Sequence, residues 1–419
     1  MAESLKPGAA RAPGHTYQEA ILKDSSKPPE AFLDYSYEFM GDQDIPYSHY
    51  TSKDYAAREM ENLWPHVWQM ACREEHIAEP GDYQVYDIGH LSAIVTRTES
   101  MEIKAYVNAC MHRGTALKPP GDNGFCQSFR CPFHGWIYSL DGELVEVPES
   151  WDFPHVGAET HSLREILVDT WAGFVFVNFD REAEPLDQFL GVLPEHFKDF
   201  DIGNRYIETH VCKRLPVNWK AAEEAFMEAY HVKETHAGGR DFSEPVTTYD
   251  VYPLNVSRFI HTVGSVNPRM PVPPTEQELL SAMWGRRGAN DQACPTVPEG
   301  VTARDVYAEV VKKNLGEQYG QDFSHYSTAQ TLDSIEYFLF PNFFIFPGLS
   351  LPMAYRFRPD PSDPDYSYFD LYFLRPSQPG VTPPPPPEPI MLDVKDSYTL
   401  AEGLGFLGAV YDQDTDNMA

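Results

Sequence analysis

Hydrophobic and polar residues alternate along the segment from residue 66 to 182, in short runs that turn-forming residues separate. Such alternation is typical of β-strands that bury one face. The runs that predict strands are GDYQVYDIG, SAIVTRT, EIKAYVNAC, GWIYSLDGEL and TWAGFVFVNFD. Because LDGE between two apolar runs is typical of a hairpin turn, we expect a small all-β domain here.

Helical periodicity flanks this segment on both sides. YAAREMENLW, beginning at Tyr55, contains neither Gly nor Pro and predicts a helix. EPLDQFLGVLPEHFKDF predicts another. NWKAAEEAFMEAYHVKETH, residues 218–236, is rich in Ala, Glu and Met, and we expect one helix that Gly238 and Gly239 terminate.

The last part of the chain predicts further strands. RYIETHVCKRLPV, IEYFLFPNFFIFPGLSLPMAYRFRP and YSYFDLYFLRP are rich in aromatic and β-branched residues and contain prolines that suit a curved sheet. The whole pattern predicts an α+β fold in three parts. These are an N-terminal arm with helices (1–65) that belongs with the last domain, the all-β domain (66–182) and the last domain (183–419).

Composition narrows the classes of partner. The formal charge of −31 opposes binding to nucleic acid or to an anionic membrane surface. No apolar run reaches the roughly 18 residues of a membrane span, and the N-terminus lacks the apolar core of a secretory signal, so we expect a cytoplasmic protein. Six cysteines among 419 residues are too few for a disulfide scaffold.

Four potential metal ligands stand in the stretch CMHRGTALKPPGDNGFCQSFRCPFHG. Cys110 and His112 form one pair, and Cys131 and His134 form the other. A classical zinc finger pairs Cys with Cys and His with His, whereas here the two types alternate. Alternation lets each of two loops deliver one ligand to each iron of a [2Fe–2S] centre that has two Cys and two His ligands.

Two alternatives remain for this stretch. A zinc site is the main one, and a disulfide between Cys110 and Cys131 is weaker because it would leave two convergent histidines unexplained. Cys126 lies outside both ligand pairs and is interpreted as a buried apolar side chain.

A second set of ligand-type residues lies in the segment 218–236. On a helix Glu228 and His231 share a face, but His231 and His236 are about 140° apart, so the helix must loosen or end before His236 for both imidazoles to reach one metal. Two imidazoles and one carboxylate form the facial triad of non-haem Fe(II) oxygenases. A diiron bundle would need a second E-x-x-H, which the sequence lacks.

The motifs CMHRG…CPFHGWIYSLDG and NWK…E-A-Y-H-x₄-H resemble the large (alpha) subunits of Rieske non-haem iron ring-hydroxylating oxygenases. The resemblance covers residues from about Tyr55 to Met418. It implies a Rieske domain inserted into a helix-grip catalytic domain, in which an antiparallel sheet wraps a long helix. His231 and His236 match the iron ligands, and Glu228 matches the acid that connects the iron with the Rieske centre of a neighbouring subunit.

The resemblance also supplies a third iron ligand. VYDQDTDNMA is similar to a D-x-D-N segment of the family whose first Asp binds iron, which maps to Asp414, with Asp412 and Asp416 as rivals. Family members continue beyond this point, so we expect the C-terminus to be truncated. Glu228, where most ring dioxygenases have Asp, is similar to the oxygenases of carnitine and glycine betaine.

The family implies two cofactors, a [2Fe–2S] cluster and Fe(II). We therefore expect a mono- or dioxygenase that takes electrons from an NAD(P)H-dependent reductase or a ferredoxin and hydroxylates a small organic substrate, such as an aromatic ring, with O₂. A homotrimer, with or without a small beta subunit, is the expected assembly. The competing class is a Rieske electron-transfer protein without oxygenase activity.

Overall fold

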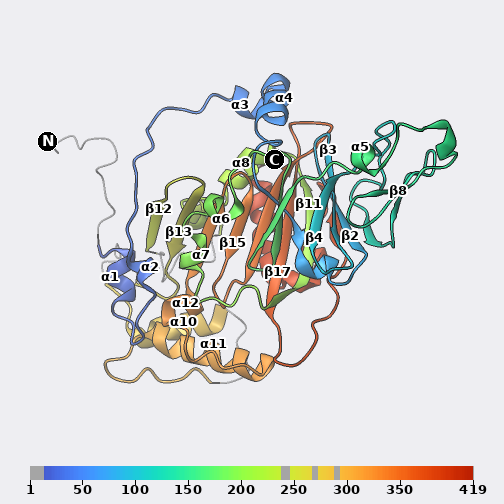
Figure 1. The fold of residues 1–419 in the computed structure, drawn as a ribbon. Coiled ribbons are helices and arrows are strands. Elements are labelled where there is room, and N and C mark those ends of the chain that lie inside the picture. Colours follow the sequence, from blue (N-terminus) through green and yellow to red (C-terminus); the bar gives the residue numbers. More distant parts are fainter. Residues whose placement is uncertain (1–13, 237–245, 267–271, 287–292, 419) are drawn as a thin grey trace.

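The computed structural model describes residues 14–236, 246–266, 272–286 and 293–418. Helices and strands are mixed throughout these residues, and Figure 1 shows the strands gathered in the middle and on one side of the molecule. The predicted α+β fold is confirmed. Gly238 and Gly239, the expected helix stop, lie outside the described residues.

The segment that carries the Cys and His pairs is all β, as predicted, apart from short helices. Antiparallel strands form a four-stranded sheet in the order β4-β3-β2-β5 and a three-stranded sheet in the order β6-β7-β8. Their bounds are β2 (Asp82–Ile88), β3 (Leu91–Arg97), β4 (Ile103–Val107), β5 (Asn123–Phe125), β6 (Phe129–Arg130), β7 (Ile137–Tyr138) and β8 (Leu144–Glu146). The hairpin predicted at LDGE joins β7 to β8. The short helix α5 (Ala158–His161) follows, at the outer side of the molecule in Figure 1.

A third small sheet connects this region to the rest of the protein. It has the order β1-β10-β9, with β1 (Gln69–Arg73), β9 (Leu167–Trp171) and β10 (Phe174–Asn178). Phe174 and Phe176 of β10 pack edge-on against Phe343, a residue of the large sheet, with ring centroids 5.0 and 5.7 Å apart. The two parts of the chain therefore share one apolar core at this contact.

The large sheet has eight strands in the order β12-β13-β14-β15-β16-β17-β11-β18. All neighbours are antiparallel except β11 and β18, which are parallel. The strands are β11 (Arg205–Leu215), β12 (Thr247–Val251), β13 (Val256–His261), β14 (Ser334–Leu339), β15 (Phe343–Phe346), β16 (Met353–Pro359), β17 (Ser367–Pro376) and β18 (Ile390–Leu392). The strands predicted from the aromatic-rich runs are confirmed.

Both faces of this sheet are buried, and alternate residues serve different cores. On β14, Ile335, Tyr337 and Leu339 pack in the core that also contains Phe174 and Phe176. Phe338 of the same strand packs in a second core with Phe344, Tyr355 and Tyr411. We call the face toward this second core the inner face, because the candidate iron ligands lie over it.

Helices cover the ends of the sheet. The longest helix in the described residues is α11 (Ala303–Tyr319), which Thr302 caps. It packs with α10 (Glu276–Arg286) and α12 (Thr328–Leu332) along the lower edge in Figure 1. The helices α1 (Tyr17–Ile21) and α2 (Glu30–Leu33) lie at one end of that edge, whereas α3 (Ser48–Thr51) and α4 (Lys53–Asn62) lie at the top of the molecule in Figure 1. The C-terminal α13 (Leu407–Asp416) packs on the inner face through Tyr411.

The expectation of one helix over EPLDQFLGVLPEHFKDF is wrong. The structure has two short helices, α6 (Leu186–Phe189) and α7 (Leu193–His196), separated at Gly191. Gly191 has φ +55°, a left-handed conformation that ends a right-handed helix.

The expectation of one helix over residues 218–236 is also wrong. Helix α8 (Trp219–Glu224) ends at Ala225, and only α9 (Val232–Thr235) follows. Between them, side chains take the backbone N–H groups that a continuous helix would direct to carbonyls: Tyr249 accepts from Ala229, and Glu228 accepts from Tyr230 and His231. The helix therefore ends well before His236, as the two-imidazole site requires.

Candidate metal centres

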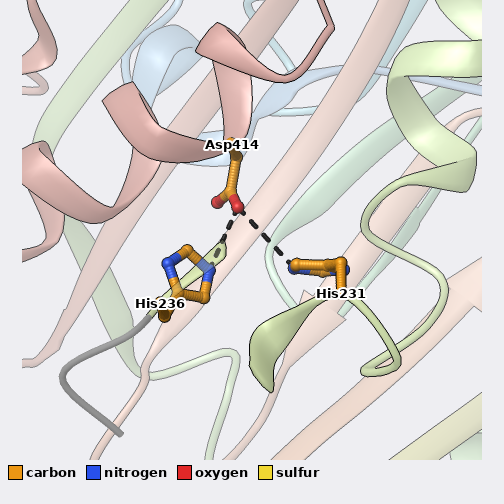
Figure 2. Close-up of side chains that lie close together, drawn as sticks. All are labelled: His231, His236 and Asp414. Atoms are coloured by element: carbon orange, nitrogen blue, oxygen red, sulfur yellow. Dashed lines mark ion pairs between the residues drawn. The ribbon is translucent and has the colours of Figure 1, made fainter. Parts of the chain in front are cut away.

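Three side chains from two distant parts of the chain converge above the inner face of the large sheet. His231 precedes α9, His236 follows it, and Asp414 lies on α13. The Oδ1 atom of Asp414 lies 3.1 Å from Nε2 of His236 and 3.6 Å from Nε2 of His231 (Figure 2). Their ligand atoms all lie within 4.8 Å of one another. We call these three residues the triad.

Hydrogen bonds orient both imidazoles of the triad. Nδ1 of His231 donates to Oε1 of Glu228 at 2.7 Å, and Nδ1 of His236 donates to Oε1 of Gln413 at 2.8 Å. In a neutral imidazole, the ring nitrogen that donates to an oxygen carries the proton, which leaves Nε2 as the unprotonated atom that can bind a metal. Both unprotonated nitrogens face Asp414.

The triad fits a first-row metal ion. Asp414 is only 8% exposed, and its Oδ1 makes no hydrogen bond of good geometry within the described residues. Two ligand atoms at right angles on one ion, each about 2.1 Å from it, are separated by about 3 Å. The separations of 3.1 and 3.6 Å are therefore close to those of a loaded site.

The other two candidate carboxylates, Asp412 and Asp416, do not face the two histidines. Asp412 accepts hydrogen bonds from the Ser397 hydroxyl at 2.5 Å and the Tyr398 backbone N–H at 2.9 Å. Asp416 is exposed. Burial lowers the pKa of Lys213 on the neighbouring β11, and the charges of Asp412 and Asp416 partly offset this effect. Residues two apart on a helix point in nearly opposite directions, so Asp414 alone faces the two histidines.

A cavity of about 280 Å³ opens between α8 and α13 beside the triad. Small and apolar side chains form most of its wall, and Glu228 contributes a carboxylate. The residues around it are Val217, Ala221, Ala225, Glu228, His231, Thr235, Asp414, Asn417 and Met418. The small residues of α8 thus leave space next to the candidate ligands.

The two Cys and His pairs lie on two loops with matching backbone hydrogen bonds. In the first loop Gly114 N–H donates to Cys110 O, and in the second Gly135 N–H donates to Cys131 O. Cys110 and Cys131 also donate from their own N–H groups to the carbonyls five residues ahead. Both glycines have positive φ, +73° and +75°, which lets each loop close back on its cysteine.

These loops bring their ligand-type side chains together. The rings of His112 and His134 have centroids 4.6 Å apart. Cys110 and Cys131 are buried free thiols; burial raises the pKa of Cys110, and the neighbouring Cys131 raises it further. The disulfide alternative is therefore not realised. Nδ1 of His112 is buried without a hydrogen-bond partner among the described residues, as a nitrogen reserved for a metal would be.

Two aromatic residues that the sequence did not single out support the first loop. The Trp136 ring stacks on His112 with centroids 4.9 Å apart and planes at 7°. The Tyr138 hydroxyl lies 3.3 Å from Cys110 Sγ and accepts the Met111 N–H at 3.1 Å. Both residues directly follow the second loop, in the run GWIY. Their role could have been predicted from this position next to the loop. Gln413, which orients His236, had no such signal because nothing in the sequence distinguishes it from a solvated side chain.

Comparison with known families agrees with both sites. Residues 67–156 match the Rieske [2Fe–2S] domain, and residues 200–418 match the ring hydroxylating alpha subunit (catalytic domain). The second match covers more than half of the chain. The protein belongs to the ring hydroxylating alpha subunit family. These two domains imply a Rieske cluster and a mononuclear iron as its cofactors.

Several curated alpha subunits resemble parts of this one. The chlorobenzene dioxygenase subunit alpha of Cupriavidus sp. (strain PS12) is 34% identical over 45% of this chain and 44% of its own length. The carnitine monooxygenase oxygenase subunit of Escherichia coli (strain K12) is 26% identical over 52% of this chain and 56% of its own. The chain thus spans about half the length of the curated relatives it matches.

Solved structures share the fold of this alpha subunit. The quaternary ammonium Rieske monooxygenase CntA in complex with L-carnitine gives a TM-score of 0.60 at 17% identity, covering 89% of this chain and 82% of that one. The naphthalene 1,2-dioxygenase from Rhodococcus sp. bound to indole gives 0.59 at 22% identity, covering 89% and 80%. In the described part of the chain, no helix is long and apolar enough to cross a membrane.

Proposed function

We propose that this alpha subunit is the oxygenase component of a Rieske-type mono- or dioxygenase, which uses O₂ and two electrons to hydroxylate an organic substrate. His231, His236 and Asp414 would hold Fe(II), and Cys110, Cys131, His112 and His134 would hold the [2Fe–2S] cluster. The observation that carries this proposal is the convergence of the triad in a chain that also carries the two cluster loops.

The triad leaves room for the chemistry of an oxygenase. His231, His236 and Asp414 would hold Fe(II) through two imidazoles and one carboxylate, and an iron ion held by this ligand set would supply the activation of O₂. The protein's own residues prepare this site. Glu228 and Gln413 hold the protons of His231 and His236 at Nδ1, so that both Nε2 atoms stay available at the required positions.

The cluster loops would form the entry point for electrons. A Rieske cluster transfers one electron at a time, so it needs an external donor, and we infer a ferredoxin or an NAD(P)H-dependent reductase. His134 is exposed, and Phe133 beside it is 58% exposed, so this side of the cluster is open to a partner. Assembly as a trimer, with or without a small subunit, and a cytoplasmic location complete the proposal.

The names of the relatives support a hydroxylation reaction but cover several classes of substrate. Their names include dioxygenases of chlorobenzene, biphenyl, benzene and anthranilate, a salicylate 5-hydroxylase and a carnitine monooxygenase. Both aromatic compounds and alkylammonium compounds therefore belong in a first substrate screen.

A metal count and an oxygen-uptake assay test the proposal. The purified protein should contain three irons and two acid-labile sulfides per chain, and with a reductase and a substrate it should form a hydroxylated product in step with O₂ consumption. A pure electron carrier would contain two irons and form no product. A colourless protein that contains zinc would contradict both functions.

A further inference from the structure

Two polar side chains on the inner face of the large sheet have no partner in the described residues. Glu336 of β14 is 4% exposed, yet no hydrogen bond or ion pair joins it to any described residue. His261 of β13 has a buried Nδ1 atom without a hydrogen-bond partner among those residues. Buried polar groups are normally paired, so both require an explanation.

The strand register places these two groups close together. Glu336 lies opposite Phe259, and His261 lies opposite Ser334, so Glu336 and His261 are diagonal neighbours on adjacent strands. Alternation puts both on the inner face, because Ile335 and Tyr337 pack in the other core. Diagonal pairs of this kind have Cα atoms about 7–8 Å apart.

The triad lies over the same part of the sheet. His231 is close enough to His261 to lower its pKa, in addition to the larger effect of burial. On β16, Tyr355 also faces inward, and its hydroxyl lies 2.6 Å from that of Tyr411, one helical turn before Asp414 on α13. Burial raises the pKa of Tyr411 and Tyr355, and the charges of both Glu336 and Asp414 raise it further, so the two carboxylates lie near the same pair of hydroxyls.

A row of aromatic rings begins beside Glu336 on this face. Phe259 is directly across from it, and Phe338 follows two residues later on the same strand. Phe344 packs on Phe338 with ring centroids 4.8 Å apart, and Tyr355 follows at 6.2 Å from Phe344. A wall of this kind attracts cations through the negative faces of its rings.

No described cation balances the carboxylate. The arginines of the sheet alternate to the opposite face, where Arg258 pairs with Asp250, and Arg356 and Arg358 pair with Asp370. Lys213 faces inward, but three backbone carbonyls take its ammonium group. Burial alone raises the pKa of Glu336 well above its ordinary range, which means that its charge is unfavourable until a cation arrives.

We propose that Glu336 recognises the substrate of this alpha subunit by binding a positively charged nitrogen, with the aromatic side chains of the inner face around it. The substrate class is therefore an organic cation, either a protonated amine or a quaternary ammonium compound. This inference rests on the proposed oxygenase function and assigns Glu336 as its specificity-determining residue.

Equilibrium binding to the iron-loaded holoenzyme tests the inference without turnover. Isothermal titration under anaerobic conditions compares choline with 3,3-dimethylbutan-1-ol, and benzylamine with benzyl alcohol. Each pair is similar in shape and differs in charge. The native protein should bind the cation of at least one pair tenfold or more tighter than its neutral counterpart, and Glu336→Gln should reduce this ratio to below threefold. Choline has no N–H donor and protonated benzylamine has three, so the comparison of these two cations identifies the type of nitrogen that is bound.

The matched control is Glu223→Gln. Glu223 is another buried carboxyl, on α8, and its Oε2 also lacks a partner in the described residues. This variant should retain the preference for the cation. Equal binding of both members of each pair by the native protein, or an unchanged ratio in Glu336→Gln, would overturn the inference.

A second variant covers the case in which Glu336→Gln does not fold. Phe259→Leu keeps an apolar side chain opposite Glu336 but removes the ring, and it should weaken the cation at least threefold while leaving its neutral counterpart unchanged. An equal loss for both compounds contradicts the inference. A protein that binds the cation but consumes no O₂ with a reductase fails only the proposed function, whereas one that hydroxylates neutral compounds and ignores cations fails only the inference.

Discussion

Glu228 holds His231 through a hydrogen bond of 2.7 Å between its Oε1 atom and Nδ1 of the imidazole. The other oxygen of the same carboxylate accepts the backbone N–H of His231 at 3.1 Å. One side chain therefore ends the helical path of the chain and orients a candidate iron ligand. The side chain of Glu228 is still 37% exposed, so a neighbouring molecule can reach it.

Glu228→Gln should leave iron binding intact but uncouple the oxidation of the cluster from the formation of product. The amide oxygen can still accept from Nδ1, so the iron content should stay at three per chain, but the charge that favours proton movement through His231 is lost. We expect the yield of hydroxylated product per cluster oxidised in a single turnover to fall tenfold or more. An unchanged yield would show that Glu228 only shapes the backbone.

Asp414→Asn should remove the mononuclear iron and leave the cluster. An amide is a weaker ligand than a carboxylate for Fe(II), so iron analysis should give two irons per chain, with the visible spectrum of the cluster retained. Asp412→Asn is the matched control, because Asp412 points toward Ser397 and Tyr398. That variant should keep three irons, and equal losses in both variants would argue against the assignment of Asp414.

Gly114→Ala should destabilise the first cluster loop. A Cβ atom would meet open space there, but a φ of +73° costs an L-residue about 1–2 kcal/mol. We expect faster loss of the cluster on heating, followed by the decay of its visible absorbance. Gly157→Ala in the same region is the control, since Gly157 has an extended φ of −160° and open space around it, and its absorbance should decay at the native rate.

Acid should destabilise the protein through His196. Burial, with a further effect of Arg258, lowers the pKa of His196 to about 4, against 6.5 for the unfolded chain. The unfolded state therefore binds more protons between these values, so the stability that this group contributes at pH 7 is lost as pH falls from 6.5 toward 4. For one such histidine the loss between pH 7 and pH 5 is about 2 kcal/mol.

Urea unfolding at the two pH values measures this effect. The free energy of unfolding of His196→Gln should change less between pH 7 and pH 5 than that of the native protein, by about 2 kcal/mol. The exposed His325 supplies the control, and His325→Gln should keep the native difference. If the free energy of unfolding of His196→Gln changed between pH 7 and pH 5 as much as that of the native protein, other groups would control the acid sensitivity.

The strands were predictable because their signals are local. In β2, β3, β11, β14 and β17 the alternation or aromatic content lies within one run of residues, and it reflects burial that the sheet then realises. Local spacing also singled out the two Cys and His pairs and the two histidines of the triad, because the glycines and acids near them belong to the same loop or turn. Their roles as ligands of a cluster and of an iron ion remain a prediction.

The end of the helix after Ala225 was not predictable in this way. Ala, Glu and Met favour a continuous helix from residue 218, and the competing acceptor for the Ala229 N–H is Tyr249, which lies on β12. A group twenty residues away in sequence, brought close only by folding, overrides local propensity. Gly238 and Gly239 were not needed for this end, because the helix has already stopped.

The order of residues along the chain was therefore enough to indicate the two ligand sets, the strands and the family resemblance. It left Asp412, Asp414 and Asp416 as rivals, since all three stand at alternate positions of one acidic tail. Folding selects the one that faces the histidines, because the packing of α13 through Tyr411 onto Tyr355 sets the rotation of that helix. The isolation of Glu336 likewise arises only in the folded chain, because the pairing of a buried charge depends on the whole sheet around it.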